Sequence, residues 1–148
     1  MKKVTLYTDG ACSVNPGVGG WGAMLIFNGI DKKISGAEGE TTNNRMELKA
    51  VIEGLKCLKE ACEVEVYSDS AYVVNAFLNG WIFNWEKNNF IKPDNKPVLN
   101  VDLWQELLGL TRKHRESFFK VKGHSDNEFN NICDKLATDA VKNFKSEL

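Results

Sequence analysis

The sequence predicts a single α/β domain with a mixed sheet of about five strands flanked by helices. Two patterns point to this class. The first third of the chain alternates apolar and polar residues between turn signals, which is typical of antiparallel strands. The middle of the chain changes to a helical period and returns to strand, which is typical of a crossover between parallel strands. The chain has 148 residues, of which 43% are hydrophobic, enough for one domain with its own core.

Three strands are expected in the first third, over residues 4–10, 21–27 and roughly 32–36. The first of them is rich in β-branched and aromatic residues and ends at an Asp-Gly pair. A glycine-rich loop over 15–20 follows it, and Asn28-Gly29, a strong hairpin signal, joins the second strand to the third. The opening of the chain is therefore predicted to be an antiparallel meander.

The apolar residues that follow have the spacing of an amphipathic helix: Leu48, Val51, Ile52, Leu55 and Leu58. Residues 64–69 return to a strand pattern. Because a helix separates them, the strands that end at Asp9 and Asp69 are expected to be parallel and adjacent.

The remaining elements are two further helices, a fifth strand and a C-terminal helix. The first helix is expected over 73–78, with Gly80 as its stop signal, and the second begins after Asn100, which serves as its N-cap. The fifth strand is expected over 117–122, and the C-terminal helix from Cys133 to Phe144. An aromatic-rich stretch over 81–90 lies between the first two of them. The first three strands are thus antiparallel and the later ones parallel.

Composition limits the possible functions. With 19 basic and 20 acidic residues the formal net charge is −1, so nucleic-acid binding would have to come from local patches. Four cysteines without a Cys-x-x-Cys pair indicate reduced thiols in a cytosolic protein rather than a disulfide framework or a zinc finger. No stretch approaches the ~18 apolar residues of a membrane span. We therefore expect a soluble, cytoplasmic protein without a membrane partner.

Four carboxylates are the strongest candidates for chemistry. Asp9 and Asp69 each end a strand, Glu47 lies in the helix between them, and Asp134 lies near the start of the last helix. Adjacent parallel strands would bring both aspartates to the carboxyl edge of the sheet, where α/β folds place their sites. Like charges in one cleft repel unless a cation lies among them. Oxygen ligands alone suit Mg²⁺ or Mn²⁺ rather than Zn²⁺.

Each carboxylate also has a structural explanation. Asp9-Gly10 suits a turn, Asn44-x-x-Glu47 has capping-box spacing, Asp69-Ser70 suits a helix cap, and Asp134 suits first-turn charge. Caps do not require aspartates at the ends of two neighbouring strands, however, so the combination favours a metal site.

Other motifs are weaker. Residues 17–22 fit G-x-G-x-x-G, but a strand rather than a helix follows them, which excludes a dinucleotide site and leaves a glycine-rich turn. His124 lies in a polar loop and is either a proton carrier or an ordinary exposed histidine. Residues 81–96 mix aromatic rings with three lysines and two acidic residues, which suits a nucleic-acid backbone only weakly. The tryptophans Trp81, Trp85 and Trp104 are alternatively expected to lock two helices together.

Several motifs run in order over nearly the whole chain: Thr8-Asp9-Gly10, Asn15-Pro16-Gly17, Thr42-Asn43-Asn44-Arg45-Met46-Glu47-Leu48, Asp69-Ser70, Trp81, Asn100-Val101-Asp102-Leu103-Trp104, Val121-Lys122-Gly123-His124 and Cys133-Asp134. Together they resemble bacterial ribonuclease H of type I. The resemblance implies one ribonuclease H domain over residues 1–148 and the fold of that family. It also implies a metal-dependent endonuclease that cuts the RNA strand of RNA–DNA hybrids and leaves 5′-phosphate and 3′-hydroxyl ends.

The resemblance also implies residue roles. Asp9, Glu47, Asp69 and Asp134 would hold two Mg²⁺ ions, with Asp9 between them and Mn²⁺ as a possible substitute. His124 would move protons or help product release. Cys12, Asn15 and Asn43 would meet the minor groove of the hybrid, where 2′-hydroxyls distinguish RNA from DNA. Thr42 and Asn100 would hold a DNA phosphate, and Trp81 would face the DNA strand.

The sequence departs from the family pattern at three places. Glu40 replaces a basic residue, Ala71 replaces a glutamine that touches RNA, and the usually basic protrusion carries Glu86, Asn88 and Asn89. We expect intact catalysis with lower, strongly salt-sensitive hybrid affinity. A non-catalytic hybrid-binding module and an exonuclease or ATPase on a related sheet are the competing interpretations. A monomer is the default expectation.

Overall fold

A five-stranded sheet in the order β3-β2-β1-β4-β5 forms the centre of the computed structural model, which describes residues 1–123 and 127–147. The strands are β1 (Lys2–Cys12), β2 (Gly17–Phe27), β3 (Ile30–Thr41), β4 (Cys62–Ser68) and β5 (Arg115–Lys120). β1, β2 and β3 pair antiparallel, whereas β4 pairs parallel with both β1 and β5. The predicted mixed sheet is therefore confirmed, including the adjacency of β1 and β4.

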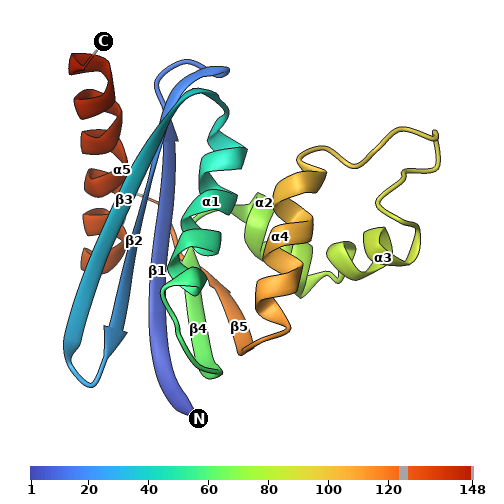
Figure 1. Ribbon diagram of the computed structural model, residues 1–148, viewed down its shortest axis with the longest axis horizontal. Coiled ribbons are helices and arrows are strands. Elements are labelled where there is room, and N and C mark those ends of the chain that lie inside the picture. The colour runs from blue at the N-terminus through green and yellow to red at the C-terminus, as the bar shows by residue number, and fades with distance from the viewer. Residues whose placement is uncertain (124–126, 148) are drawn as a thin grey trace.

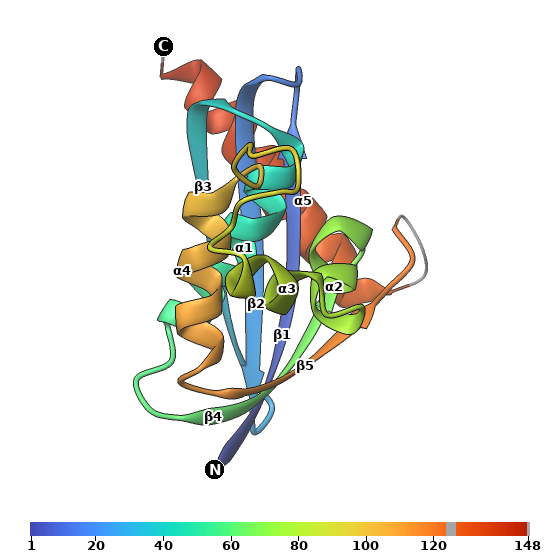
Figure 2. The same ribbon diagram turned by 90° about the vertical axis from the view of Figure 1, so that its right-hand side faces the viewer.

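Helices cover both faces of this sheet. They are α1 (Asn43–Lys56), α2 (Ala71–Leu78), α3 (Trp81–Lys87), α4 (Val101–Thr111) and α5 (Glu128–Ser146). α5 lies against β1, β2 and β3 on one face, and α1 lies against β1 and β2 on the other, with α4 packed on α1 (Figure 1). Viewed from the α3 side, α4, α3 and α2 lie in front of the sheet and α5 behind it (Figure 2).

β1 is the central strand of the sheet, between β2 and β4, and its residues Val4, Leu6 and Thr8 are buried on one face. Leu6 is fully buried and lies beside Leu25 of β2 and Val66 of β4. A Cβ on Gly54 of α1 would meet the Leu6 side chain at 2.6 Å, so the missing side chain brings α1 close to the sheet. This contact holds the helix in place above β1.

α1 confirms the predicted apolar stripe, although its ends differ from the prediction. Leu48, Val51, Ile52 and Leu55 are all fully buried, whereas Leu58 follows the last helical residue. The N-cap is Thr42, whose hydroxyl oxygen accepts a hydrogen bond from the Arg45 backbone N–H at 3.2 Å. The capping-box explanation of Asn44-x-x-Glu47 is therefore wrong.

The glycine-rich segment is strand rather than turn, because β2 begins at Gly17 and not at Trp21. A Cβ on Gly22 would lie 2.6 Å from the carbonyl oxygen of Cys133 in α5, and a Cβ on Gly20 would collide with that of Ala137. These glycines allow α5 to approach the face of β2. Their function is close packing of a helix on a strand, which composition alone did not show.

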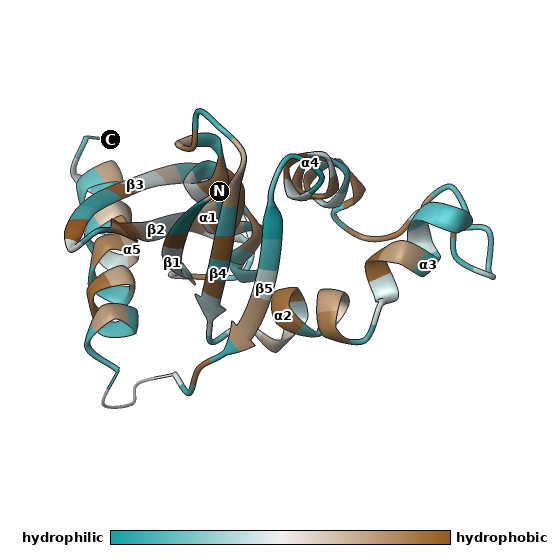
Figure 3. Ribbon diagram, turned by 90° about the horizontal axis from the view of Figure 1, so that it is seen from below, coloured by the Kyte–Doolittle hydropathy of each residue, from teal (hydrophilic) through white to brown (hydrophobic). Residues whose placement is uncertain are grey.

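Of the three tryptophans expected to join two helices, Trp85 and Trp104 do so. Trp104 of α4 is fully buried and meets Trp85 of α3 in a T-shaped contact with centroids 5.3 Å apart. Trp81 begins α3 and is 42% exposed. α3 and the loop that follows it lie at the opposite end of the molecule from α5, where Figure 3 also shows a largely hydrophilic loop.

The four cysteines are free thiols, as predicted. Within residues 1–123 and 127–147, no helix combines the length and the apolar character needed to cross a lipid bilayer.

Substituting Gly22→Ala should destabilise the fold by about 1–3 kcal/mol, because the added methyl group overpacks the contact between β2 and α5. The matched control is Gly109→Ala, at an exposed position of α4 where a Cβ meets nothing within 4 Å. That change should stabilise by about 0.5–1 kcal/mol through helix propensity. Denaturant unfolding measures both, and equal stabilities of Gly22→Ala and the parent chain would contradict the close-packing explanation.

Candidate active site

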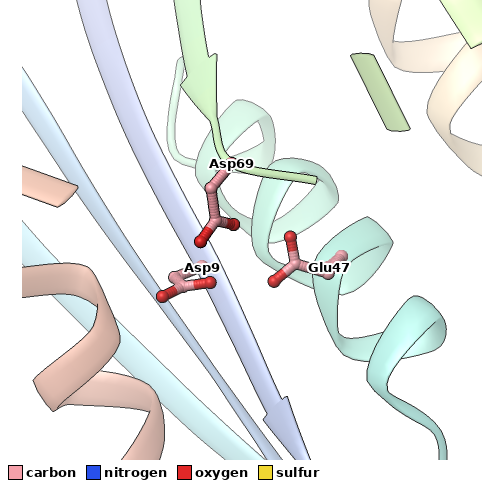
Figure 4. A group of neighbouring side chains, drawn as sticks. All are labelled: Asp9, Glu47 and Asp69. Atoms are coloured by element: carbon pink, nitrogen blue, oxygen red, sulfur yellow. The ribbon is translucent and has the colours of Figure 1, made fainter. Parts of the chain in front are cut away.

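Three carboxylates from three different elements converge at one edge of the sheet. Asp9 of β1, Glu47 of α1 and Asp69, which follows β4, each offer an oxygen atom, and these atoms lie within 4.8 Å of one another. Figure 4 shows the three side chains directed toward a common point. The convergence that the sequence predicted for these residues is therefore present.

Strand register places the two aspartates side by side. In the parallel pairing of β1 with β4, Thr8 lies opposite Ser68, so Asp9 and Asp69 each follow a paired residue at the same edge. Asp9 is still part of β1 and lies opposite Gly22 of β2. The turn explanation of Asp9-Gly10 is therefore wrong, because the strand continues to Cys12.

Glu47 reaches the aspartates because Gly10 has no side chain. A Cβ on Gly10 would lie 2.6 Å from the backbone nitrogen of Glu47, so any other residue would push α1 away from β1. The Gly10 backbone N–H donates to Glu47 Oε1 and, at 2.9 Å, to Asp9 Oδ1. The Ser68 hydroxyl donates to Glu47 Oε2 at 3.5 Å. One glycine N–H thus links the two carboxylates and orients both.

The site concentrates negative charge away from water. Asp9 is 5% exposed and Glu47 is 3% exposed. Burial, together with the charges of Asp69 and Asp134, raises the pKa of Asp9 to about 7. Burial and the charge of Asp9 raise the pKa of Glu47 well above its ordinary value. Ionised carboxylates so close together require compensating positive charge.

Asp134 lines the same cleft but lies outside the tight group of three. The cleft has a volume of about 420 Å³, and Asp134 lines it from α5 together with Asn44, Ser70 and the three carboxylates. Asp134 lies beyond the first turn of α5, whose acidic residue is Glu128, so the explanation as first-turn charge is wrong. Its charge contributes to the raised pKa of Asp9.

Two further predictions concern the segments next to the site. Ser70 is the N-cap of α2, since its hydroxyl oxygen accepts from the Val73 N–H at 3.3 Å, which leaves the Asp69 carboxylate without a capping role. His124 lies outside the described residues. Gly123 directly precedes it, and a Cβ there would lie 2.8 Å from Asp69 Oδ2.

The donor set fits a divalent cation. Three carboxylates supply only oxygen ligands, which suit hard cations such as Mg²⁺ and Mn²⁺. Burial and the neighbouring negative charges raise the pKa values of Asp9 and Glu47, and a cation bound between them would compensate that charge.

The expected groove contacts lie close to one another, and Asn43 is the one that lines the cleft. The Asn43 backbone N–H donates to Asn15 Oδ1 at 3.1 Å, which joins the β1–β2 loop to the start of α1. The Cys12 thiol donates to the Val14 carbonyl at 2.8 Å and lies 3.6 Å from the Thr41 carbonyl oxygen in the same region. Both asparagines are exposed, so their polar groups are accessible to a ligand.

The two expected phosphate contacts are connected through Arg45. Its backbone N–H donates to Thr42, and its guanidinium donates to Asn100 Oδ1 at 3.2 Å. The same guanidinium forms a two-point ion pair with Asp102, at 3.0 and 2.7 Å. Sequence reasoning missed this connection and also missed Tyr72, which lines the cleft. The only signal for Tyr72 was its position directly after Asp-Ser-Ala. Of the six expected substrate contacts, Asn43 lines the cleft, whereas the other five lie outside its lining: Cys12, Asn15, Thr42, Trp81 and Asn100.

Comparisons with known proteins agree with the fold and identify the family. A family model described as RNase H matches residues 1–142. The chain is 63% identical to "Ribonuclease H" of Caldanaerobacter subterraneus subsp. tengcongensis over 139 residues, which cover 94% of this chain and 91% of the relative. It is 60% identical to "Ribonuclease H" of Acetivibrio thermocellus over 142 residues, covering 96% and 97% of the two chains.

Solved structures with the same fold include LC9-RNase H1, described as a type 1 RNase H with the type 2 active-site motif. It superposes with a TM-score of 0.86 at 26% identity, covering 96% of this chain and 73% of that one. LC11-RNase H1 in complex with an RNA/DNA hybrid superposes with a TM-score of 0.71 at 24% identity, covering 95% and 97%.

Asp9→Asn should stabilise the metal-free protein by about 1–3 kcal/mol, because it removes one buried charge from the group of three. Millimolar Mg²⁺ should stabilise the parent chain and reduce this difference, since a ligand that binds only the folded state raises its stability. Thermal unfolding in EDTA and in Mg²⁺ measures both effects.

Asp139→Asn is the matched control, since Asp139 is an exposed carboxylate paired with Lys135. Its effect should be within about 0.5 kcal/mol and independent of Mg²⁺. Destabilisation by Asp9→Asn in EDTA would contradict the repulsion argument.

Proposed function

The chain belongs to the ribonuclease H family, and from this premise we propose that it hydrolyses the RNA strand of RNA–DNA hybrids internally, using two Mg²⁺ ions. The products would be 5′-phosphate and 3′-hydroxyl ends. The observation that carries the proposal is the convergence of Asp9, Glu47 and Asp69 within 4.8 Å at the end of an open cleft. Asp134, on the wall of the same cleft, would complete the ligand set.

The residues of the site prepare it for this reaction. Bound divalent cations would supply Lewis acidity, which activates the attacking water and stabilises the leaving 3′-oxygen. Asp9 would be the shared ligand of the cations, because its carboxylate meets Glu47 at the Gly10 N–H and lies beside Asp69 through the pairing of β1 with β4. The Gly10 N–H keeps Asp9 and Glu47 in position before any ligand binds. This preorganisation lowers the cost of assembling the site during the reaction.

Substrate recognition would use the polar groups around the cleft. We assign Cys12, Asn15 and Asn43 to the minor groove, where RNA presents its 2′-hydroxyls. Their clustering through the Asn43–Asn15 hydrogen bond supports this assignment. Thr42 and Asn100 would hold a phosphate of the DNA strand, and Trp81, exposed on α3, would face that strand. His124 would carry protons or assist product release, on the basis of its motif.

The remaining properties follow from the family and the composition. We propose one ribonuclease H domain over residues 1–148 that acts as a monomer in the cytoplasm, where its four thiols stay reduced. Mn²⁺ would be able to replace Mg²⁺ at an all-oxygen site.

The direct test uses a labelled RNA–DNA hybrid with blocked ends, in Mg²⁺ and in EDTA. Internal cuts confined to the RNA strand and abolished by EDTA are expected, while single-stranded RNA and duplex DNA stay intact. Asp9→Asn should lower turnover by more than about 100-fold, since metal-ion catalysis contributes several kcal/mol, and should retain hybrid binding. Binding by the parent chain without cutting would favour the binding module, and cutting that requires free ends would favour the exonuclease.

Glu40→Lys should raise hybrid affinity about 3- to 10-fold and make its salt dependence steeper by about one unit of slope. Glu40 is exposed two residues before Thr42, so the change replaces repulsion of a phosphate by attraction. The control is Glu60→Lys, an identical charge change at an exposed position paired with Lys2. Equal gains from both variants would show that only net charge matters.

A further inference from the structure

The Tyr72 hydroxyl is a hydrogen-bond junction at the wall of the cleft. Its oxygen accepts from Asn100 Nδ2 at 3.0 Å and from Trp104 Nε1 at 3.0 Å. Tyr72 belongs to α2, whereas Asn100 and Trp104 belong to the start of α4. Tyr72 also lines the cleft that contains the carboxylates. One oxygen atom therefore connects the cleft wall to two groups of α4.

Asn100 has an unusual backbone for its position. It is the N-cap of α4 with a left-handed φ of 62°, and its side chain makes no capping hydrogen bond. Asparagine tolerates this conformation better than most residues, although it still costs free energy. A residue held in such a conformation by its surroundings is a sign of a functional constraint. The side chain forgoes capping and is directed to Arg45 and Tyr72 instead.

The chemistry of the neighbours determines which way the Asn100 amide points. An arginine guanidinium can only donate, so Arg45 requires the amide oxygen on its side. The indole N–H of Trp104 also only donates, which makes the Tyr72 oxygen an acceptor. The Asn100 NH₂ group therefore faces Tyr72. One of its two N–H bonds is used there, and the other has no acceptor among the described residues.

We propose that Tyr72 is a positioning residue for hybrid binding. Its hydroxyl oxygen holds the Asn100 amide so that the second N–H of Asn100 meets a non-bridging oxygen of a DNA-strand phosphate. This inference rests on the proposed function, which assigns Asn100 to that phosphate. Little positive charge is available to attract this phosphate, because Glu40 is acidic and the Arg45 guanidinium is already paired with Asp102. The neutral N–H donor of Asn100 must therefore be held in a fixed orientation to bind it.

Tyr72→Phe separates this role from packing. The Tyr72 ring lies 5.2 Å from the Trp104 ring in a tilted contact, which phenylalanine preserves. The change removes the oxygen alone, so Asn100 loses its acceptor. Trp104→Phe is the matched control, because it also breaks a hydrogen bond of this hydroxyl and loses stability, yet leaves the Tyr72–Asn100 bond in place.

The first measurement compares steady-state cleavage and hybrid affinity. Tyr72→Phe should raise KM, and the Kd measured in EDTA, about 5- to 10-fold, with kcat unchanged within about twofold. Trp104→Phe should lower Tm while Kd stays within about twofold. Equal losses of affinity in the two variants, or a loss of kcat without a change of KM, would overturn the proposal.

The second measurement identifies the phosphate. Hybrids with a single uncharged methylphosphonate, placed in turn along the DNA strand, should weaken binding of the parent chain at one position. Asn100→Ala should abolish this positional effect and Tyr72→Phe should reduce it, because non-additive effects mark groups that act on one contact. If Tyr72→Phe instead weakened binding by the same factor at every methylphosphonate position, the role of Tyr72 would be overturned, while the proposed function would stand. Failure of the parent chain to cut or bind any hybrid would overturn the proposed function and this inference together.

Discussion

Parallel pairing between β1 and β4 places Asp9 and Asp69 at the same sheet edge, and every other feature of the site is arranged around that pair. The register of Thr8 with Ser68 determines their spacing. Parallel strands need a long crossover, which α1 supplies, and the crossover carries Glu47 back over the same edge. The connection that allows β1 and β4 to pair in parallel therefore also carries the third carboxylate, Glu47.

Bringing the three carboxylates together destabilises the folded state, and other contacts in the fold must offset that destabilisation. Three carboxylates within 4.8 Å, two of them almost fully buried, repel one another until a cation or a proton intervenes. The surrounding core offsets that repulsion through apolar contacts such as Leu6 against Gly54. The Gly10 N–H adds the only backbone donor that both Asp9 and Glu47 share among the described residues. The stability of the scaffold thus holds the site ready for metal binding.

The sequence was sufficient to predict the order of elements and the convergence of the carboxylates, because both depend on local patterns and on topology. It was insufficient where contacts between distant segments determine where a strand begins or which side chains bond to one another. β2 begins at Gly17 since its glycines pair with β3 and accommodate α5, although glycine has low strand propensity. The role of Tyr72 could not be predicted from the sequence, because its hydrogen-bond partners Asn100 and Trp104 lie far along the chain at the start of α4 and no spacing rule connects them.

The start of α1 explains how weakly basic surroundings can still support specific recognition. Thr42 caps the helix, Asn43 holds Asn15, and Arg45 holds Asn100 while its charge is balanced by Asp102. The polar side chains near the cleft are therefore oriented by hydrogen bonds to one another, and the surface does not depend on unpaired lysine or arginine side chains. Oriented neutral donors contribute little long-range attraction but discriminate strongly by geometry, because a misplaced acceptor leaves them unpaired. Such a surface suits a substrate distinguished by the shape of its groove and its 2′-hydroxyls more than by its charge, since charge is common to all nucleic acids.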